Sequence, residues 1–200
     1  MNVMGISGTP RKKGNSEILL RYALKPFKNN GWQVKTFLLS ELNIRSCIAC
    51  GKCRQIGKCV INDDMQQIYE AFRWCNAIII SSPVYYLNVS TQLLSLLVRH
   101  YAVHDEKPLK GKVGGVITVG NGNCGGQTLA ANFLFTWMLS CGIVCVPGEL
   151  SAVKAVADKA GDILNQKNQL KQAEILGFNI LNFAKELKPI SQVISYPKNN

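Results

Sequence analysis

The chain has 200 residues, 47% of them hydrophobic and 8 of them cysteine, with a formal net charge of +11 at pH 7. This size suits one domain with one core, and no segment reaches the ~18 to 20 apolar residues that a membrane span requires. Basic residues follow the first short apolar run, which argues against a signal peptide, so we expect a cytoplasmic protein with no membrane partner. The positive charge favours anionic partners, but no basic run is interleaved with aromatic residues, and no nucleic-acid partner is expected.

Apolar runs alternate with helical patterns along the chain. The short apolar runs predict strands at 2–7, 32–39, 77–81, 112–119 and 142–146. Helical patterns predict helices at 16–28, 63–72, 90–101 and 127–139, and a long helix or helix pair over 155–187. This order predicts an α/β fold: a doubly wound, five-stranded parallel sheet with helices on both faces and a cysteine-rich loop after the second strand. We expect one domain over 1–188, with the cysteine loop at 47–59, and a C-terminal tail over 189–200.

The loop after the first strand combines hydroxyls, basic side chains and backbone N–H groups at the start of a helix. It runs from Ser7 to Ser16 as Ser-Gly-Thr-Pro-Arg-Lys-Lys-Gly-Asn-Ser. Such a helix start is a phosphate site by construction. The spacing is neither that of a Walker loop nor Gly-x-Gly-x-x-Gly, which disfavours a nucleoside triphosphate and a dinucleotide. The alternative is an ordinary helix start with a basic, solvated loop.

Two further loops follow the third and fourth strands and should lie at the same edge of the sheet. The segment from Ser81 to Ser90 carries Tyr85 and Tyr86, which could lie beside a flat ring or pack a subunit interface. The glycine-rich segment from Gly120 to Gly126 permits close backbone approach to a ligand, or is simply a flexible turn.

Four cysteines, which we call the loop cysteines, are spaced C-x2-C-x2-C-x5-C. They are Cys47, Cys50, Cys53 and Cys59. This opening is the one that ferredoxin segments use to hold an iron–sulfur cluster. A structural zinc site and a set of metal-free thiols are the alternatives, although zinc sites usually pair two separate C-x2-C units.

The remaining thiols and the two histidines show no such pattern. Three cysteines next to apolar runs, which we call the sheet cysteines, are predicted to be core residues: Cys75, Cys141 and Cys145. Cys124 lies in the glycine-rich loop. His100 and His104 have the spacing of a metal pair, but without a third ligand nearby we expect a solvated or interface pair.

The three loops, in this order, resemble those of the NADPH-dependent FMN reductase-like flavoproteins, and the resemblance runs from Met1 to about Val146. With the cysteine spacing, the chain is similar to the archaeal iron–sulfur flavoproteins. The resemblance implies a flavodoxin-like fold, FMN, a 4Fe–4S cluster on the loop cysteines, and a homodimer or homotetramer. We expect FMN to contact Ser7, Thr9, Arg11, Lys13, Gly14, Asn15, Ser16, Pro83, Val84, Tyr85, Tyr86, Asn88, Gly120, Asn121, Gly122, Cys124, Gly125 and Gly126.

These expectations lead to an FMN-dependent oxidoreductase that moves electrons between a ferredoxin-like donor, the cluster and the flavin to a small acceptor. A basic surface suits an acidic donor of that kind. One alternative is an NAD(P)H-dependent FMN or quinone reductase without a working cluster, and another is a redox-sensing or interaction module. No residue stands out as a catalytic acid or base.

Overall fold

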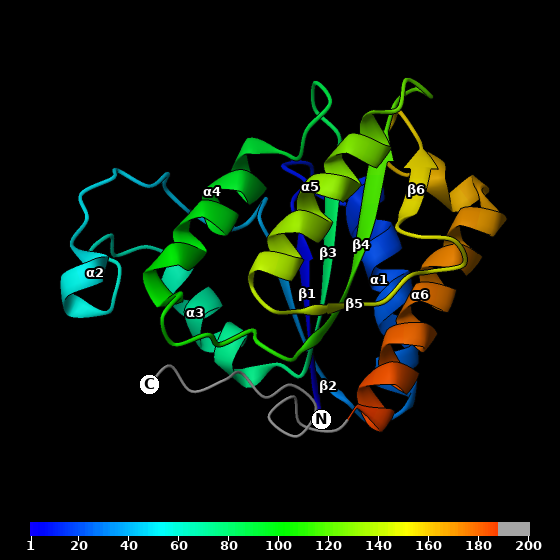
Figure 1. Ribbon diagram of the computed structural model, residues 1–200. Coiled ribbons are helices and arrows are strands. Elements are labelled where there is room, and N and C mark those ends of the chain that lie inside the picture. Colours follow the sequence, from blue (N-terminus) through cyan, green and yellow to red (C-terminus); the bar gives the residue numbers. More distant parts are fainter. Residues whose placement is uncertain (188–200) are drawn as a thin grey trace.

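Residues 1–187 are described by the computed structural model, and their strands form one parallel sheet (Figure 1). The strands are β1 (Asn2–Ser7), β2 (Gln33–Leu38), β3 (Ala77–Pro83), β4 (Val113–Gly120), β5 (Val144–Cys145) and β6 (Val153–Val156). Their order is β2-β1-β3-β4-β5, with β6 also paired to β4. This confirms the doubly wound prediction. The chain reverses direction across the sheet between β1 and β3, which is where such folds bind ligands.

Helices cover both faces of the sheet. The α-helices are α1 (Asn15–Asn29), α2 (Cys53–Ile56), α3 (Met65–Trp74), α4 (Thr91–Arg99), α5 (Gly126–Ser140) and α6 (Lys167–Glu186), and the 3-10 helices are η1 (His100–Val103) and η2 (Asp162–Asn165). On one face α1 and α6 pack together, and on the other lie α3, α4 and α5. No helix within residues 1–187 has the length and apolar character needed to cross a membrane.

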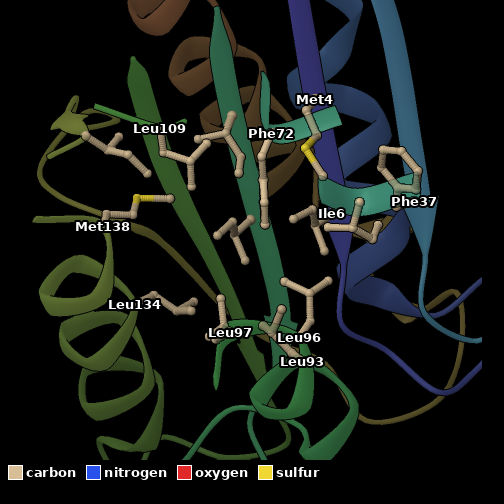
Figure 2. Packing of buried hydrophobic residues seen from close by; sticks show 14 of the residues in the cluster. Met4, Ile6, Phe37, Phe72, Leu93, Leu96, Leu97, Leu109, Leu134 and Met138 are labelled. Carbon is tan, nitrogen blue, oxygen red and sulfur yellow. The ribbon is translucent and has the colours of Figure 1, made fainter. Parts of the chain in front are cut away.

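Alternating strand residues build a core on each face of the sheet. From β1, Met4 and Ile6 enter the core under α3, α4 and α5, whereas Val3 enters the core under α1 and α6. Figure 2 shows Met4 and Ile6 from β1 beside Phe72 of α3, with Leu134 of α5 at the far side of the same cluster. The carboxyl ends of the strands are followed by loops that lie outside both cores, and those loops form the candidate site.

The C-terminal third differs from the sequence prediction. The sequence predicts one long helix or a helix pair over 155–187, but Val153–Val156 is strand β6 and the long helix begins only at Lys167. In this strand Val153 and Ala155 are buried and Lys154 is exposed, which is the two-residue alternation of a strand. A segment of four residues is too short for this alternation to be recognised in a sequence. The fifth strand is correspondingly short, and β6 continues the pairing farther along β4. The predicted tail, 189–200, lies outside the described residues.

Candidate functional site

A cavity of about 290 Å³ opens at the carboxyl ends of β1, β3, β4 and β6. This is close to the lower limit of small-molecule pockets, about 300 Å³. Eleven of the residues expected to contact FMN line it: Thr9, Arg11, Gly14, Asn15, Ser16, Pro83, Val84, Tyr85, Tyr86, Gly120 and Asn121. The structure thus brings all three predicted loops to one cavity.

The first loop forms a cradle at the start of α1. The leading N–H groups of an α-helix have no acceptor inside the helix and carry partial positive charge, so they favour an anion. A Cβ on Gly14 would come within 2.8 Å of Thr9 Oγ1, so only glycine lets the loop close this tightly. Thr9 Oγ1 also accepts a hydrogen bond from the Arg11 N–H, at 3.2 Å. The turn, the helix start and the Arg11 guanidinium together suit a phosphate.

Asn15 lines the cavity, but its side chain is fully engaged with another segment. Its Oδ1 accepts from the N–H groups of Gly161 (3.0 Å) and Ile163 (3.3 Å), and its Nδ2 donates to the carbonyl of Lys159 (2.9 Å). These bonds hold the segment after β6 against the start of α1. That segment contributes three cavity residues that the sequence prediction missed: Ala157, Asp158 and Ala160.

The aromatic loop after β3 is anchored by serine hydroxyls. Ser90 Oγ donates to the carbonyl of Gly8 (2.6 Å) and accepts from the Leu93 N–H (3.2 Å), so it caps α4 and joins the aromatic loop to the phosphate loop. The tip is a tight turn in which Tyr86 and Leu87 have φ values of 46° and 69°. Left-handed backbone is uncommon in residues with a side chain, and it holds the fully exposed Tyr86 at the mouth of the cavity.

The other expected contact residues lie outside the cavity lining. They are Ser7, Lys13, Asn88, Gly122, Cys124, Gly125 and Gly126. Ser7 is buried at the end of β1, and its Oγ has no hydrogen-bond partner within residues 1–187. Gln127 ties the glycine-rich loop to β6: its Nε2 donates to the carbonyls of Gly122 (2.7 Å) and Ala155 (3.3 Å). Val119 also lines the cavity and was not predicted.

The four loop cysteines line a second, smaller cavity of about 40 Å³, and all are free thiols. Positive φ values at Ala49, Gly51 and Gly57 turn the loop back on itself. The Ala49 N–H donates to Cys47 Sγ at 3.4 Å, a contact of the kind that tunes iron–sulfur clusters. Within the described residues no three metal-binding side chains converge tightly enough to hold an ion. Four sulfur donors in an apolar cavity suit a thiolate-bound cluster. The four thiols line the same cavity, but they do not converge on one point as the ligands of a bound metal do.

A buried ion pair lies under this loop. Arg99 Nη1 donates to Asp63 Oδ2 at 2.6 Å, and the two side chains are 1% and 2% exposed. Burial alone would raise the pKa of Asp63, but hydrogen bonds from Arg99 and from the N–H groups of Arg45 and Met65 lower it below its usual value. Asp63 is therefore a carboxylate at neutral pH.

The sheet cysteines pack on the core as predicted. Burial raises the pKa of Cys141 to about 11, so this thiol is a poor nucleophile. The solvated or interface position expected for His100 is wrong. Its ring is buried against Phe72 and Trp137, and burial, with a smaller effect of His104, lowers its pKa to about 4.

Comparison with known proteins agrees with this architecture. The family model for NADPH-dependent FMN reductase matches residues 1–157. The chain is 38% identical to an iron–sulfur flavoprotein of Methanosarcina thermophila over 147 residues, covering 73% of this chain and 77% of that protein. It is 32% identical to an iron–sulfur flavoprotein of Methanocaldococcus jannaschii over 192 residues, covering 94% and 100%.

A solved structure supports the fold independently. A WrbA-like flavodoxin protein from Agrobacterium tumefaciens superposes with a TM-score of 0.66 at 16% identity, over 94% of this chain and 98% of that one. The predicted flavodoxin-like fold and the predicted resemblance are both confirmed. The chain belongs to the NADPH-dependent FMN reductase family and, within it, groups with the iron–sulfur flavoproteins.

Proposed function

We propose that this protein binds FMN in the cavity at the strand ends and a 4Fe–4S cluster on the loop cysteines. We further propose that it passes electrons between an acidic, ferredoxin-like donor, the cluster and the flavin to a small acceptor. The observation that carries the proposal is that four free thiols line one cavity while a separate cavity combines an anion cradle with aromatic walls. The cytoplasm is the proposed location, because thiols stay reduced there.

The flavin cavity supplies different groups to the two ends of FMN. Thr9, Ser16 and Arg11 lie at the helix start and would hold the phosphate, with Arg11 kept in place by the carbonyl of Asp158 (3.1 Å). Tyr85 and Tyr86 would flank the flat ring. A cradle for one phosphate favours FMN over FAD.

The cysteine loop supplies thiolates and a basic surface. When both groups are bound, the cluster carries one electron at a time and FMN carries one or two, which allows single electrons to be combined into a two-electron reduction. Lys52, Arg54 and Lys58 are exposed on this loop. Their charges would offset the negative charge of the thiolates and attract an acidic donor.

We also propose that the protein assembles as a homodimer or homotetramer in which the cysteine loop of one subunit approaches the flavin cavity of another. The two cavities share no lining residue. In Figure 1, the segment around α2 stands out beside α3 and α4, away from the loops that follow β3 and β4. Ile48, Val98 and Tyr86 expose apolar surface that a second subunit could cover. A monomer by light scattering at micromolar concentration would refute this arrangement.

The decisive experiment is the visible spectrum of anaerobically purified protein together with its iron, sulfide and flavin content. The proposal predicts FMN, with iron and acid-labile sulfide in equal amounts. Bound zinc, bound FAD or iron-free protein after anaerobic reconstitution would contradict it.

The family match favours one alternative, an NAD(P)H-dependent FMN or quinone reductase whose cysteines do not hold a working cluster. Stopped-flow reduction of the flavin by NADPH under anaerobic conditions tests it. If NADPH reduces the flavin rapidly, and equally fast after the loop cysteines are replaced, the alternative is correct. Slow reduction by NADPH and rapid reduction by a ferredoxin would support the main proposal.

A further inference from the structure

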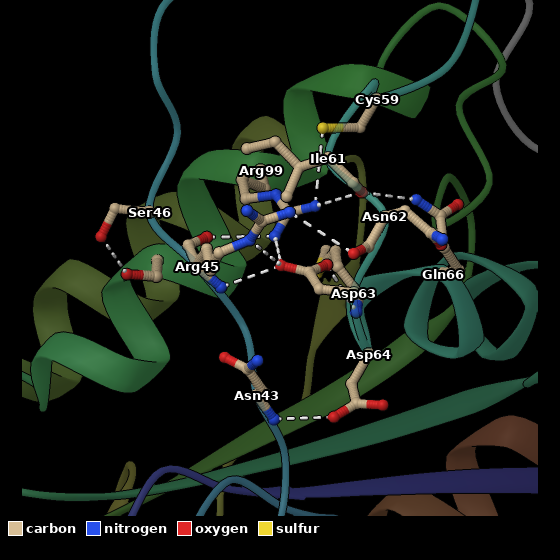
Figure 3. Close-up of polar contacts among 12 residues, drawn as sticks. Asn43, Arg45, Ser46, Cys59, Ile61, Asn62, Asp63, Asp64, Gln66 and Arg99 are labelled. Carbon is tan, nitrogen blue, oxygen red and sulfur yellow. Dashed lines mark hydrogen bonds and ion pairs between the residues drawn. The ribbon is translucent and has the colours of Figure 1, made fainter.

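Arg99, the last residue of α4, is buried under the cysteine loop and contacts both of its ends. Its Nη1 donates to the carbonyl of Arg45 (3.0 Å), two residues before Cys47. Its Nη2 donates to the carbonyl of Ile61 (3.3 Å) and lies 3.5 Å from the sulfur of Cys59. Figure 3 shows the guanidinium between the two chain segments, with Asp63 on one side and Cys59 on the other.

The two terminal nitrogens of the guanidinium have different partners. Nη1 faces Asp63, which supplies the opposite charge that a buried arginine requires. Nη2 faces the Cys59 sulfur and one carbonyl. The planar guanidinium group holds these directions fixed relative to one another, which a lysine ammonium cannot do. One N–H is thus aimed at one of the four thiols.

We propose that Arg99 is a positioning residue that fixes Cys59 and sets the reduction potential of the iron–sulfur cluster by donating an Nη2–H hydrogen bond to the Cys59 sulfur. This inference rests on the proposed function. A donor directed at a ligand sulfur stabilises the reduced, more negative state of a cluster, so it shifts the potential to more positive values. Arg99 lines the cysteine cavity and is not among the residues that line the flavin cavity.

The chain offers a matched control for charge alone. The Arg45 guanidinium also lies near Asp63, with Nε 3.9 Å from Oδ2, but it is 59% exposed and makes no contact with a loop-cysteine sulfur among the described residues. Arg45→Gln removes a positive charge beside the Asp63 carboxylate and leaves the contact between Arg99 Nη2 and the Cys59 sulfur intact. Arg99→Lys keeps the charge and removes the fixed direction of the donor.

The test is a potentiometric titration of the cluster in reconstituted protein, followed by EPR, with iron and sulfide measured in parallel. Arg99→Gln and Arg99→Lys should shift the cluster potential to more negative values, and Arg45→Gln, which removes a charge on a side chain that is 59% exposed and screened by solvent, should shift it less. Asp63→Asn removes a negative charge near the cluster and keeps the arginine, so it should shift the potential to more positive values. If Arg99→Gln fails to hold a cluster, Arg99→Lys, which keeps the positive charge, decides: a potential more negative than wild type supports the inference, and a potential equal to wild type overturns it.

A merely structural role for Arg99 predicts a different pattern. In that case Arg99 and Asp63 variants lose iron together or shift the potential in the same direction, and either result overturns the inference. Equal potentials in Arg99→Lys and wild type overturn it as well. If the wild-type protein holds no iron and sulfide, the proposed function itself is refuted. This outcome is distinguishable from failure of the Arg99 inference because it is seen in the wild-type protein, without any variant.

Discussion

Replacing Asn15 with alanine tests how the flavin cavity is held together. The substitution removes one donated and two accepted hydrogen bonds between the start of α1 and the segment after β6. It leaves the Gly14 turn and the helix start in place. The cavity wall formed by Ala157, Asp158 and Ala160 should therefore loosen, while the phosphate cradle keeps its shape.

The expected loss of stability follows from those three bonds. A net contribution of about 0.5 to 1.5 kcal/mol for each bond suggests a total of roughly 2 to 4 kcal/mol. The upper part of this range applies because Ile163 is fully buried, so its N–H would be left without a partner. Against a typical free energy of unfolding of about 5 to 15 kcal/mol, this loss is large.

Urea unfolding of flavin-free protein, followed by circular dichroism, measures the loss. Exposed Asn132 on α5 gives a matched control, because Asn132→Ala should leave the free energy of unfolding within about 0.5 kcal/mol of wild type. FMN affinity, measured by quenching of flavin fluorescence, should fall by about tenfold in Asn15→Ala. If Asn15→Ala unfolds at the same urea concentration as Asn132→Ala, the claim that Asn15 fastens this wall is wrong.

Three further predictions concern the thiols, the phosphate cradle and pH. Replacing any one loop cysteine by alanine should lower the iron and sulfide content while FMN remains bound. Replacing a sheet cysteine by serine should leave the iron content unchanged and lower the stability of the fold. Full iron content in all four alanine variants would contradict the ligand assignment. Reversing the charge at Arg11 should weaken FMN binding, and unchanged retention on dialysis would count against the cradle. The pKa of His100 is lowered to about 4 in the folded state. The unfolded chain therefore takes up the proton first as pH falls below about 6.5, and roughly 2 kcal/mol of stability should be lost between pH 7 and pH 5, a slope that His100→Gln should flatten in urea titrations.

The sequence allows prediction of features that depend on short segments. The apolar runs of β1, β3 and β4 mark the central strands, and parallel geometry then places the loops that follow them at one edge. The loop cysteines are close in the chain, so their gathering round one cavity follows from local turns such as those at Gly51 and Gly57.

Features that depend on distant segments could not be predicted in this way. The Asn15 side chain has the composition of a ligand contact, but its partners lie more than 140 residues away and use all of its polar atoms. Arg99 reads as a polar residue at the end of a helix, and only the folded chain shows it buried against Asp63. Burial of His100 was missed for the same reason, because Trp137, which covers it, comes from α5.

Helix α4 relates the two candidate sites within one chain. Its capping residue, Ser90, is bonded to Gly8 of the phosphate loop, and its last residue, Arg99, is bonded to both ends of the cysteine loop. Nine helical residues at ~1.5 Å each span roughly 14 Å, so a rigid element of that length separates the two anchors. The helix packs into the core through Leu93, Leu96 and Leu97, so the separation cannot close without unpacking the sheet face. This fixed separation of the two anchors is one reason for proposing that a second subunit brings a cysteine loop nearer to the flavin cavity.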